Sequence, residues 1–176
     1  MTREGRSMTS KINRAVGGEL GQQAPEIDLP MVAGAAGQPG QEEIAGEGLW
    51  RLRDQRGHTV VLHFYPRDET PVCTQQLCAV RDQWAEYQAT GAVVVGINTD
   101  SIEAHRSFRA RHHFPFPLLS DAKGEVVRAF GMTNLLGVRR GVIVIDSEGV
   151  VRYRKVVFPL FRPSDEEVLA VIRSLV

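Results

Sequence analysis

A strand that leads directly into a helix restricts the fold of this 176-residue chain more than any other part of its sequence. Residues 59–64 are apolar and mostly β-branched with one polar interruption, which indicates a strand buried on both faces. After a short turn, Thr70 is a good N-cap and Pro71 a good first helical residue. Apolar residues then recur at intervals of three and four, at Leu77, Val80, Trp84 and Tyr87. This periodicity predicts one amphipathic helix over residues 71–89.

Both cysteines of the chain lie at the start of this helix. On the predicted register Cys73 is the third helical residue, and Cys78 follows five positions later. The first turn of a helix has unpaired backbone N–H groups and a partial positive charge, which stabilise a thiolate, the nucleophilic form of cysteine. A free cysteine is more often a small core residue. The cap, the proline and the preceding strand nevertheless favour a reactive role for Cys73.

The spacing of the two cysteines predicts a conformational change. Five residues of ideal helix correspond to about 7.5 Å of rise and roughly 140° of rotation, so the two Cα atoms lie about 8.6 Å apart. A disulfide needs a Cα separation below roughly 6.8 Å and converging Cβ vectors. If Cys73 and Cys78 form a disulfide, the start of the helix must therefore unwind. We expect an element that is helical when reduced and opened when oxidised.

Charge and composition argue against several classes of protein. The 21 basic and 21 acidic side chains balance, which does not favour a nucleic acid or an anionic membrane surface as a partner. No apolar run is long enough to span a bilayer, and residues 1–20 lack the apolar core of a secretory signal. We interpret residues 1–20 as a disordered leader, residues 21–176 as a single domain, and the protein as cytoplasmic. Two cysteines in a reducing compartment are more often catalytic, redox-active or metal-binding than a structural disulfide.

Zinc is one alternative use of the cysteine pair. A structural zinc site needs four ligands and usually takes cysteines at tighter spacing. The remaining candidates make no recognised ligand pattern with the cysteines: they are His58, His63, His105, His112 and His113. The sequence therefore does not favour a metal site.

The remaining segments alternate between strands and helices. Residues 31–48, rich in Gly and Ala, predict a surface loop. Prolines restrict residues 114–121 to an edge strand, and Asp100 and Ser164 are expected to cap helices with Glu103 and Glu167 as capping-box partners. Strands are expected at residues 59–65, 92–98, 142–145 and 150–157, and helices at 71–89, 100–112, 122–130 and 164–175. This order predicts an α/β fold with a mixed central β-sheet flanked by helices.

Two further side chains are candidates for a site around Cys73. Thr70 lies three residues earlier, so its hydroxyl can reach the same region, although an N-cap needs no further role. Arg140 precedes an expected strand, close enough to reach the turn. Because Arg139 is its neighbour, the residues alone leave open which arginine takes part.

The arrangement Pro66-x-x-x-Thr70-x-x-Cys73 resembles the active-site motif of the peroxiredoxins. The second cysteine, Cys78, resembles that of the bacterioferritin-comigratory or Q-type (atypical two-cysteine) subgroup. From Ala24 onward, further segments resemble the family in the same order, at residues 52–57, 98–101, 104–105, 115–121 and 140–146. The resemblance implies a thioredoxin-like fold and a thiol peroxidase that reduces hydrogen peroxide and organic hydroperoxides without a metal, haem or flavin.

The resemblance also implies a role for each site residue. Cys73 would be the peroxidatic cysteine, which becomes a sulfenic acid. Thr70 and Arg140 would hold the peroxide, and Pro66 would shield the sulfur from water. Cys78 would be the resolving cysteine, and a thioredoxin-type protein would reduce the resulting intramolecular disulfide.

The alignment with the family selects Arg140 over Arg139, because the family's arginine lies six residues before the aspartate that ends the strand, here Asp146. We expect a monomer or a weak dimer.

The sequence departs from the subgroup at several positions. Val72 replaces a usual Gly, Gln76 a usual Glu, and Val142 a usual Thr or Ser, while residues 31–48 resemble an insertion. We expect Gln76, which removes a carboxylate between the cysteines, to affect resolution. Two alternative functions remain: a thiol–disulfide oxidoreductase, disfavoured because Cys-x-x-Cys is absent, and a non-enzymatic redox sensor that uses the same cysteine switch.

Overall fold

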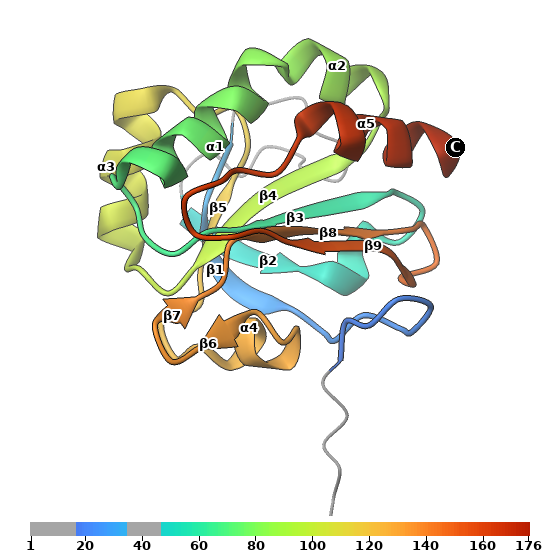
Figure 1. The fold of residues 1–176 in the computed structure, drawn as a ribbon, viewed down its shortest axis with the longest axis horizontal. Helices are drawn as coiled ribbons and strands as arrows, with labels where there is room; N and C mark the ends of the chain where they lie inside the picture. Colours follow the sequence, from blue (N-terminus) through green and yellow to red (C-terminus); the bar gives the residue numbers. More distant parts are fainter. Residues whose placement is uncertain (1–16, 35–46) are drawn as a thin grey trace, which may run out of the picture.

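One mixed β-sheet lies at the centre of the molecule (Figure 1). The structure is a computed structural model, and it describes residues 17–34 and 47–176. In these residues the sheet has the strand order β2-β1-β5-β4-β3-β8-β9. Strands β3, β4 and β5 run parallel, whereas β8 is antiparallel to β3 and β9 to β8. The strands are β1 Asp28–Val32, β2 Glu47–Arg51, β3 Val60–Phe64, β4 Val93–Asn98, β5 Leu118–Ser120, β8 Gly141–Ile145 and β9 Val151–Val156.

Helices cover both faces of the sheet, as the expected fold class requires. Figure 1 shows α1, α2, α3 and α5 on one face, and α4 with the small β6–β7 hairpin on the other. A short 3₁₀ helix, Leu52–Gln55, follows β2. The remaining elements are α1 Pro71–Asp82, α2 Trp84–Ala89, α3 Ile102–His112, α4 Glu125–Ala129, β6 Thr133–Asn134, β7 Gly137–Val138 and α5 Asp165–Ser174.

Strand β3 is a buried interior strand between β4 and β8, and it carries the chain to the start of α1. Val60, Leu62 and Phe64 pack in the core on the side of α4, while Val61 packs on the side of α1 and α5. All residues of the strand are buried, as the apolar pattern predicts. Each fully buried apolar side chain of this size contributes about 1.5–3 kcal/mol, so the strand is a firm support for the turn that follows it.

The predicted helix over residues 71–89 is two helices. Thr70 is the N-cap and Pro71 the first residue of α1, as expected. The helix ends at Asp82 because Gln83 has φ −102° and ψ 20°, outside the helical region, and α2 begins at Trp84. Apolar periodicity continues across this break because both helices bury the same face, so the sequence pattern alone does not show the interruption.

Two other expectations are corrected. Strand β5 pairs with both β4 and β1, so it is an interior strand and not an edge strand. The prolines of this segment come before Leu118, so the backbone N–H groups of the paired residues remain available for hydrogen bonds. Helix α3 is capped by Ser101, whose Oγ accepts from Ala104 N at 3.2 Å. The Asp100 carboxylate instead accepts from Asp68 N at 2.7 Å, so it is not available as a cap.

The ends of the expected leader and loop are also corrected. Gly18 is buried and its carbonyl accepts from Arg154 Nη1 at 3.4 Å, so the expected leader ends before residue 20. Met31 and Val32 belong to β1, and β2 begins at Glu47, so strand pairing takes both ends of the expected 31–48 loop. The rest of these two predictions, residues 1–16 and 35–46, lies outside the described residues.

The C-terminal part follows the sequence closely. Strands β8 and β9 form the predicted antiparallel hairpin. Ser164 caps α5 by accepting from Glu167 N at 3.3 Å, while the Glu167 carboxylate pairs with Lys155 instead of returning to the cap. Of the helices described, none has the length and apolar character needed to cross a bilayer.

His63 of β3 is a buried imidazole that makes stability depend on pH. Its two ring nitrogens have no hydrogen-bond partner among residues 17–34 and 47–176, and burial lowers its pKa to about 4. An unfolded histidine titrates near 6.5, so below that pH the unfolded state takes up a proton that the folded state refuses. The free energy of unfolding therefore carries no penalty from His63 at neutral pH, and it falls as the pH drops from about 6.5 towards 4.

We expect His63→Leu to remove about 2–3 kcal/mol of the stability difference between pH 7 and pH 4.5, because it removes this proton uptake. Urea unfolding of wild type and variant at both pH values measures the difference. His113→Asn is the matched control, since His113 is exposed and Asn tolerates its left-handed backbone (φ 54°). An identical pH dependence in wild type and His63→Leu would contradict the prediction.

Candidate active site

Cys73 lies in a buried position at the start of α1. It is fully buried in the core between α1, α5 and the sheet. Arg140 Nη1 donates to its Sγ at 3.2 Å, and Arg140 is itself only 5% exposed. A buried cation and a helix N-terminus, the two groups beside this sulfur, both interact favourably with negative charge. Of the two adjacent arginines, Arg140 is the one whose guanidinium bonds to the sulfur; its role in the reaction stays a prediction.

Sheet register explains how Arg140 reaches a cysteine 67 residues away in the sequence. In the β3–β8 pair, Phe64 lies opposite Gly141, so Arg140 stands beside the point where the chain leaves β3 for α1. A side chain at Gly141 would place its Cβ 2.3 Å from the main-chain oxygen of Lys155. Only glycine allows this close approach of β9, which fixes the backbone that carries Arg140.

Gln76 holds the guanidinium in place. Its Oε1 accepts from Arg140 Nη1 at 2.9 Å, and its Nε2 donates to the main-chain oxygen of Phe64 at 3.4 Å. Arg140 Nε also donates to the main-chain oxygen of Pro159 at 3.4 Å. Because Gln76 is an amide, this contact brings no negative charge to the guanidinium. From the sequence alone, Gln76 was considered only as the loss of a carboxylate. Because residues three apart on a helix lie on the same face, the spacing from Cys73 could have indicated that Gln76 lies beside the sulfur.

Thr70 and Pro66 lie in the turn before α1. The Thr70 hydroxyl donates to the main-chain oxygen of Arg67 at 3.0 Å and does not cap the helix. Pro66 lines a cavity together with Arg140. Both predicted residues therefore belong to the loop around Cys73, although no contact of either with the sulfur is recorded.

Cys78 lies five residues further along α1, about one and a half turns away, and is half-buried. Both cysteines are free, and α1 is continuous through both of them. This is the helical form that the prediction assigns to the reduced protein, while the switch itself and its opened state stay a prediction. Burial raises the pKa of the Cys78 thiol, an effect that nearby Arg81 opposes and Asp82 reinforces.

Comparison with known proteins decides the family. Residues 20–154 match the AhpC/TSA family. This chain belongs to the AhpC/TSA family. The family and its named relatives indicate a thiol-dependent peroxidase.

Relatives of the chain include peroxiredoxins of the predicted subgroup. The chain is 36% identical over 141 residues to a putative peroxiredoxin Bcp from Coxiella burnetii, covering 76% of this chain and 85% of the relative. It is 44% identical over 101 residues to chloroplastic peroxiredoxin Q from Triticum aestivum, covering 56% of this chain and 46% of that protein. Among solved structures, Mycobacterium tuberculosis AhpC superposes with a TM-score of 0.78 at 28% identity, covering 89% of this chain and 92% of that one. The thioredoxin-like fold is confirmed.

A buried polar network anchors the turn of this peroxiredoxin. The Asp68 carboxylate accepts from the Tyr65 hydroxyl at 2.8 Å and from Asn98 Nδ2 at 3.0 Å. It also pairs with His105 Nδ1 at 2.6 Å, while His105 Nε2 donates to the main-chain oxygen of Leu119 at 3.0 Å. Burial, then Asp68, raises the pKa of the Tyr65 hydroxyl. The network ties the turn to β4, α3 and β5.

Sequence reasoning noted the segments of Asn98 and His105 as family-like without assigning them a role. Asp68 was not singled out at all. A carboxylate inside the turn before Cys73 could have drawn attention to Asp68. Its partners Asn98 and His105, however, are 30 and 37 residues away in the sequence. Only the fold brings them together.

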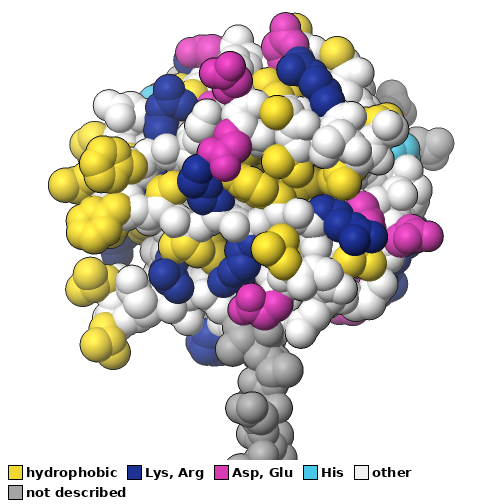
Figure 2. Space-filling view, turned by 45° about the vertical axis from the view of Figure 1, so that its right-hand side comes forward, with side chains coloured by type: hydrophobic (Ala, Val, Ile, Leu, Met, Phe, Trp, Pro, Cys, Tyr) yellow, Lys and Arg dark blue, Asp and Glu magenta, His cyan; other side chains and the backbone are white. Residues whose placement is uncertain are grey.

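An apolar cavity of about 590 Å³ opens beside Arg140. Its apolar lining consists of Pro66, Leu136, Val138, Val156, Phe158 and Pro159. Exposed apolar side chains continue from it on two loops, at Leu135, Leu136, Phe158, Leu160 and Phe161. Figure 2 shows hydrophobic side chains projecting along one edge of the molecule.

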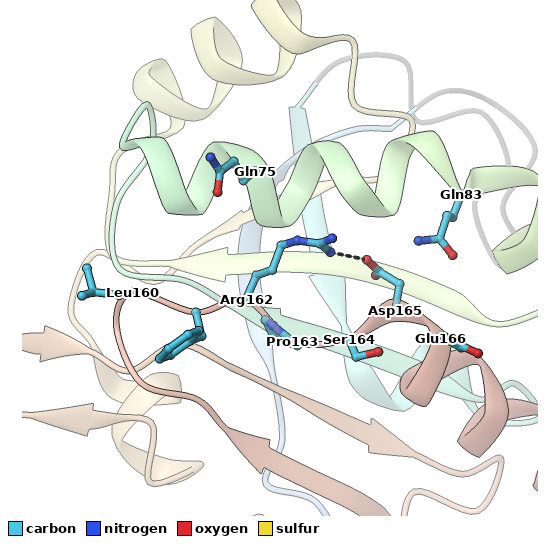
Figure 3. Close-up of a pocket in the computed structure, with 9 residues that line it drawn as sticks. Gln75, Gln83, Leu160, Arg162, Pro163, Ser164, Asp165 and Glu166 are labelled. Atoms are coloured by element: carbon cyan, nitrogen blue, oxygen red, sulfur yellow. Dashed lines mark hydrogen bonds and ion pairs between the residues drawn. The ribbon is translucent and has the colours of Figure 1, made fainter.

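A second cavity, of about 480 Å³, lies between α1 and the start of α5 (Figure 3). Figure 3 shows Arg162 and Asp165 pointing towards one another, with Nη1 and Oδ2 3.2 Å apart. The Tyr87 hydroxyl also donates to Asp165, at 2.8 Å. These bonds fasten the segment before α5, which carries the Pro159 carbonyl that holds Arg140.

The described residues contain no group of three or more histidine, cysteine or acidic side chains arranged to hold a metal ion. The contact between the Cys73 sulfur and the Arg140 guanidinium is the arrangement on which the chemistry of this site is built.

Proposed function

We propose that this peroxiredoxin reduces hydrogen peroxide and organic hydroperoxides at Cys73. The single observation that carries the proposal is the contact of 3.2 Å between Arg140 Nη1 and Cys73 Sγ in a buried site at a helix N-terminus. In the reaction the thiolate attacks one peroxide oxygen, an S–O bond forms and the O–O bond breaks. The sulfur is oxidised to a sulfenic acid, and the leaving oxygen takes up a proton as water or an alcohol.

Arg140 contributes in two ways. Its charge favours the thiolate before the reaction, and the same group stabilises the negative charge that develops on the leaving oxygen. Gln76 and the Pro159 carbonyl keep the guanidinium oriented, so little reorganisation is needed. The Thr70 hydroxyl binds the peroxide in this proposal, and Pro66 limits access of water to the sulfur.

The apolar cavity beside Arg140 supports the organic hydroperoxide part of the proposal. Its apolar side chains offer an alkyl group a place to leave water, at about 25 cal/mol per Å² of apolar surface buried. Hydrogen peroxide gains nothing from such a surface. The cavity therefore favours binding of the larger substrates next to the reactive centre.

Cys78 then resolves the sulfenic acid as an intramolecular disulfide, which requires α1 to open. A thioredoxin-type protein reduces this disulfide by thiol–disulfide exchange. The proposal includes a single domain over residues 21–176, a monomer or weak dimer and a cytoplasmic location, where a reducing environment would maintain the free thiols.

A steady-state assay with thioredoxin, thioredoxin reductase and NADPH tests the function. We expect NADPH oxidation that depends on hydrogen peroxide or on an alkyl hydroperoxide, and a monomer-sized oxidised protein with one internal disulfide on a non-reducing gel. Reduction of insulin disulfides without peroxide turnover would instead identify a thiol–disulfide oxidoreductase. Oxidation by one equivalent without turnover would favour a sensor, and a disulfide-linked dimer would contradict the role of Cys78.

A further inference from the structure

The resolving thiol lies where its own helix does not activate it. Cys78 is in the interior of α1, whereas Cys73 has the helix N-terminus and Arg140. Burial is the main effect on Cys78, and it raises the pKa of its thiol. Attack on a sulfenic acid requires the thiolate, because the thiol is a poor nucleophile. A neighbouring group that takes the proton of Cys78 would therefore speed its attack on the sulfenic acid.

His112 offers a nitrogen to this thiol. The ring is on the last residue of α3, and its Nδ1 lies 4.0 Å from Cys78 Sγ. Two aromatic rings fix the imidazole: Phe108 meets it edge-on at a centroid distance of 5.2 Å, and Phe114 stacks on it at 5.5 Å. Its side chain is 22% exposed, so the ring is held and still connected to solvent.

The other ring nitrogen faces a carboxylate. His112 Nε2 lies 3.5 Å from Glu69 Oε2, and it is buried without a hydrogen bond to any residue that the structure describes. With the proton on Nε2, Nδ1 is free to accept the thiol proton, and the carboxylate stabilises the imidazolium that results. Thiol, imidazole and carboxylate therefore follow one another as nucleophile, base and orienting group.

Charged groups on two helices and the turn surround this arrangement. On α1, Arg81 lowers the pKa of the thiol and Asp82 raises it. Arg81 Nη1 also donates to the main-chain oxygen of His112 at 2.7 Å, which ties α1 to the end of α3. Arg111 Nη1 lies 3.2 Å from Glu69 Oε2, so the carboxylate is shared between the imidazole and this exposed arginine.

Glu69 connects the imidazole to the peroxidatic centre. It lies four residues before Cys73 in the turn, and its φ of 63° is a conformation that non-glycine residues seldom adopt. His112 thus contacts the thiol on one side and the turn that precedes the sulfenic acid on the other. It stands between the turn that precedes α1 and the part of α1 that carries Cys78.

We infer that His112 is the general base of the resolving step, an inference that rests on the proposed function. The imidazole takes the proton of Cys78 while α1 is still helical, and the thiolate then attacks Cys73 as the first turns open. An S–S bond forms and the S–O bond of the sulfenic acid breaks. The Cys78 sulfur is oxidised, the Cys73 sulfur is reduced, and the departing hydroxide takes up a proton to leave as water. The imidazolium returns its proton to solvent.

The test separates the two half-reactions in the holoprotein. Single-turnover mixing with hydrogen peroxide yields the rate of sulfenic acid formation by dimedone trapping, and the rate of resolution by the loss of free Cys78 in mass spectra. For His112→Gln we expect unchanged sulfenic acid formation and resolution slower by on the order of 100-fold. His112→Phe, which keeps aromatic packing on Phe114 but has no base, should show the same loss. His113→Asn, at the exposed neighbour, should resolve as wild type does.

A pH profile distinguishes a base from a packing residue. In wild type the resolving rate should depend only weakly on pH between about pH 7 and pH 8.5, because the imidazole takes up the thiol proton. In His112→Gln it should rise roughly tenfold per pH unit, since the thiol must then ionise to solvent. Equal resolving rates, or parallel pH profiles, would overturn the inference. Absence of any sulfenic acid in wild type would instead overturn the proposed function.

Discussion

Replacing Cys73 by Ser is expected to lower the rate of peroxide reduction by on the order of 10⁴-fold or more. A serine hydroxyl stays protonated at neutral pH, and neither Arg140 at 3.2 Å nor the helix N-terminus can make it an effective nucleophile towards a peroxide. Loss of hydrogen peroxide with thioredoxin, thioredoxin reductase and NADPH measures the effect. Circular dichroism establishes that the buried substitution leaves the fold intact.

The control for this variant is Cys78→Ser, which keeps the peroxidatic sulfur. We expect it to consume one equivalent of peroxide and to leave a sulfenic acid that dimedone traps. Persistent turnover in Cys73→Ser would sink the mechanism. Normal recycling of Cys78→Ser with thioredoxin would show that Cys78 is not the resolving residue, without affecting the role of Cys73.

The second large effect is expected for Arg140→Gln. Loss of a buried cation that contacts both Cys73 Sγ and Gln76 Oε1 should slow sulfenic acid formation by about 10²–10³-fold, the range for removing one preorganised donor from a reacting oxygen. Arg140→Lys should recover little of the rate, because a single ammonium does not reproduce the guanidinium's fixed donors. Stopped-flow mixing with hydrogen peroxide at one pH measures the second-order rate constant.

Arg139→Gln is the matched control for this prediction. Arg139 is the adjacent residue and also lines the apolar cavity, yet its guanidinium makes no recorded contact with Cys73. We expect the second-order rate constant of Arg139→Gln with hydrogen peroxide to remain within a few-fold of the wild-type value. Equal losses at the two arginines would point to the summed charge of the loop instead of the contact with sulfur. Thermal melts of both variants exclude unfolding as the cause.

The cysteine spacing and the Gln76 contact bear on the same structural element. Gln76 lies between the two cysteines on α1 and bonds to Arg140 and to the end of β3. Opening of the helix start for disulfide formation must break or move these bonds. The group that orients Arg140 during peroxide reduction is therefore also one that holds α1 closed, which couples the end of the first step to the start of the second.

Local pattern was sufficient for the elements around the site. The buried strand, Thr70 at the N-cap position, Pro71 at the first helical position and the antiparallel pair before α5 were all predicted, because each depends on residues within one strand or turn. Where the prediction was wrong, the cause was a distant partner. Asp100 does not cap α3 because Asp68, 32 residues earlier, uses its carboxylate. Strand β5 is not at an edge because β1 pairs with it.

The sequence by itself determined that Cys73 lies at a helix N-terminus and that Cys78 follows at a spacing which a disulfide could bridge only if the helix opened, since both follow from helix geometry and from neighbouring residues. Motif resemblance added Arg140. Only the tertiary structure decided how Arg140 is held by Gln76, that Asp68 and His105 anchor the turn, and that His112 lies between Cys78 and Glu69. Side chains from different elements meet through sheet register and helix packing, and no pattern within a single segment specifies where they meet.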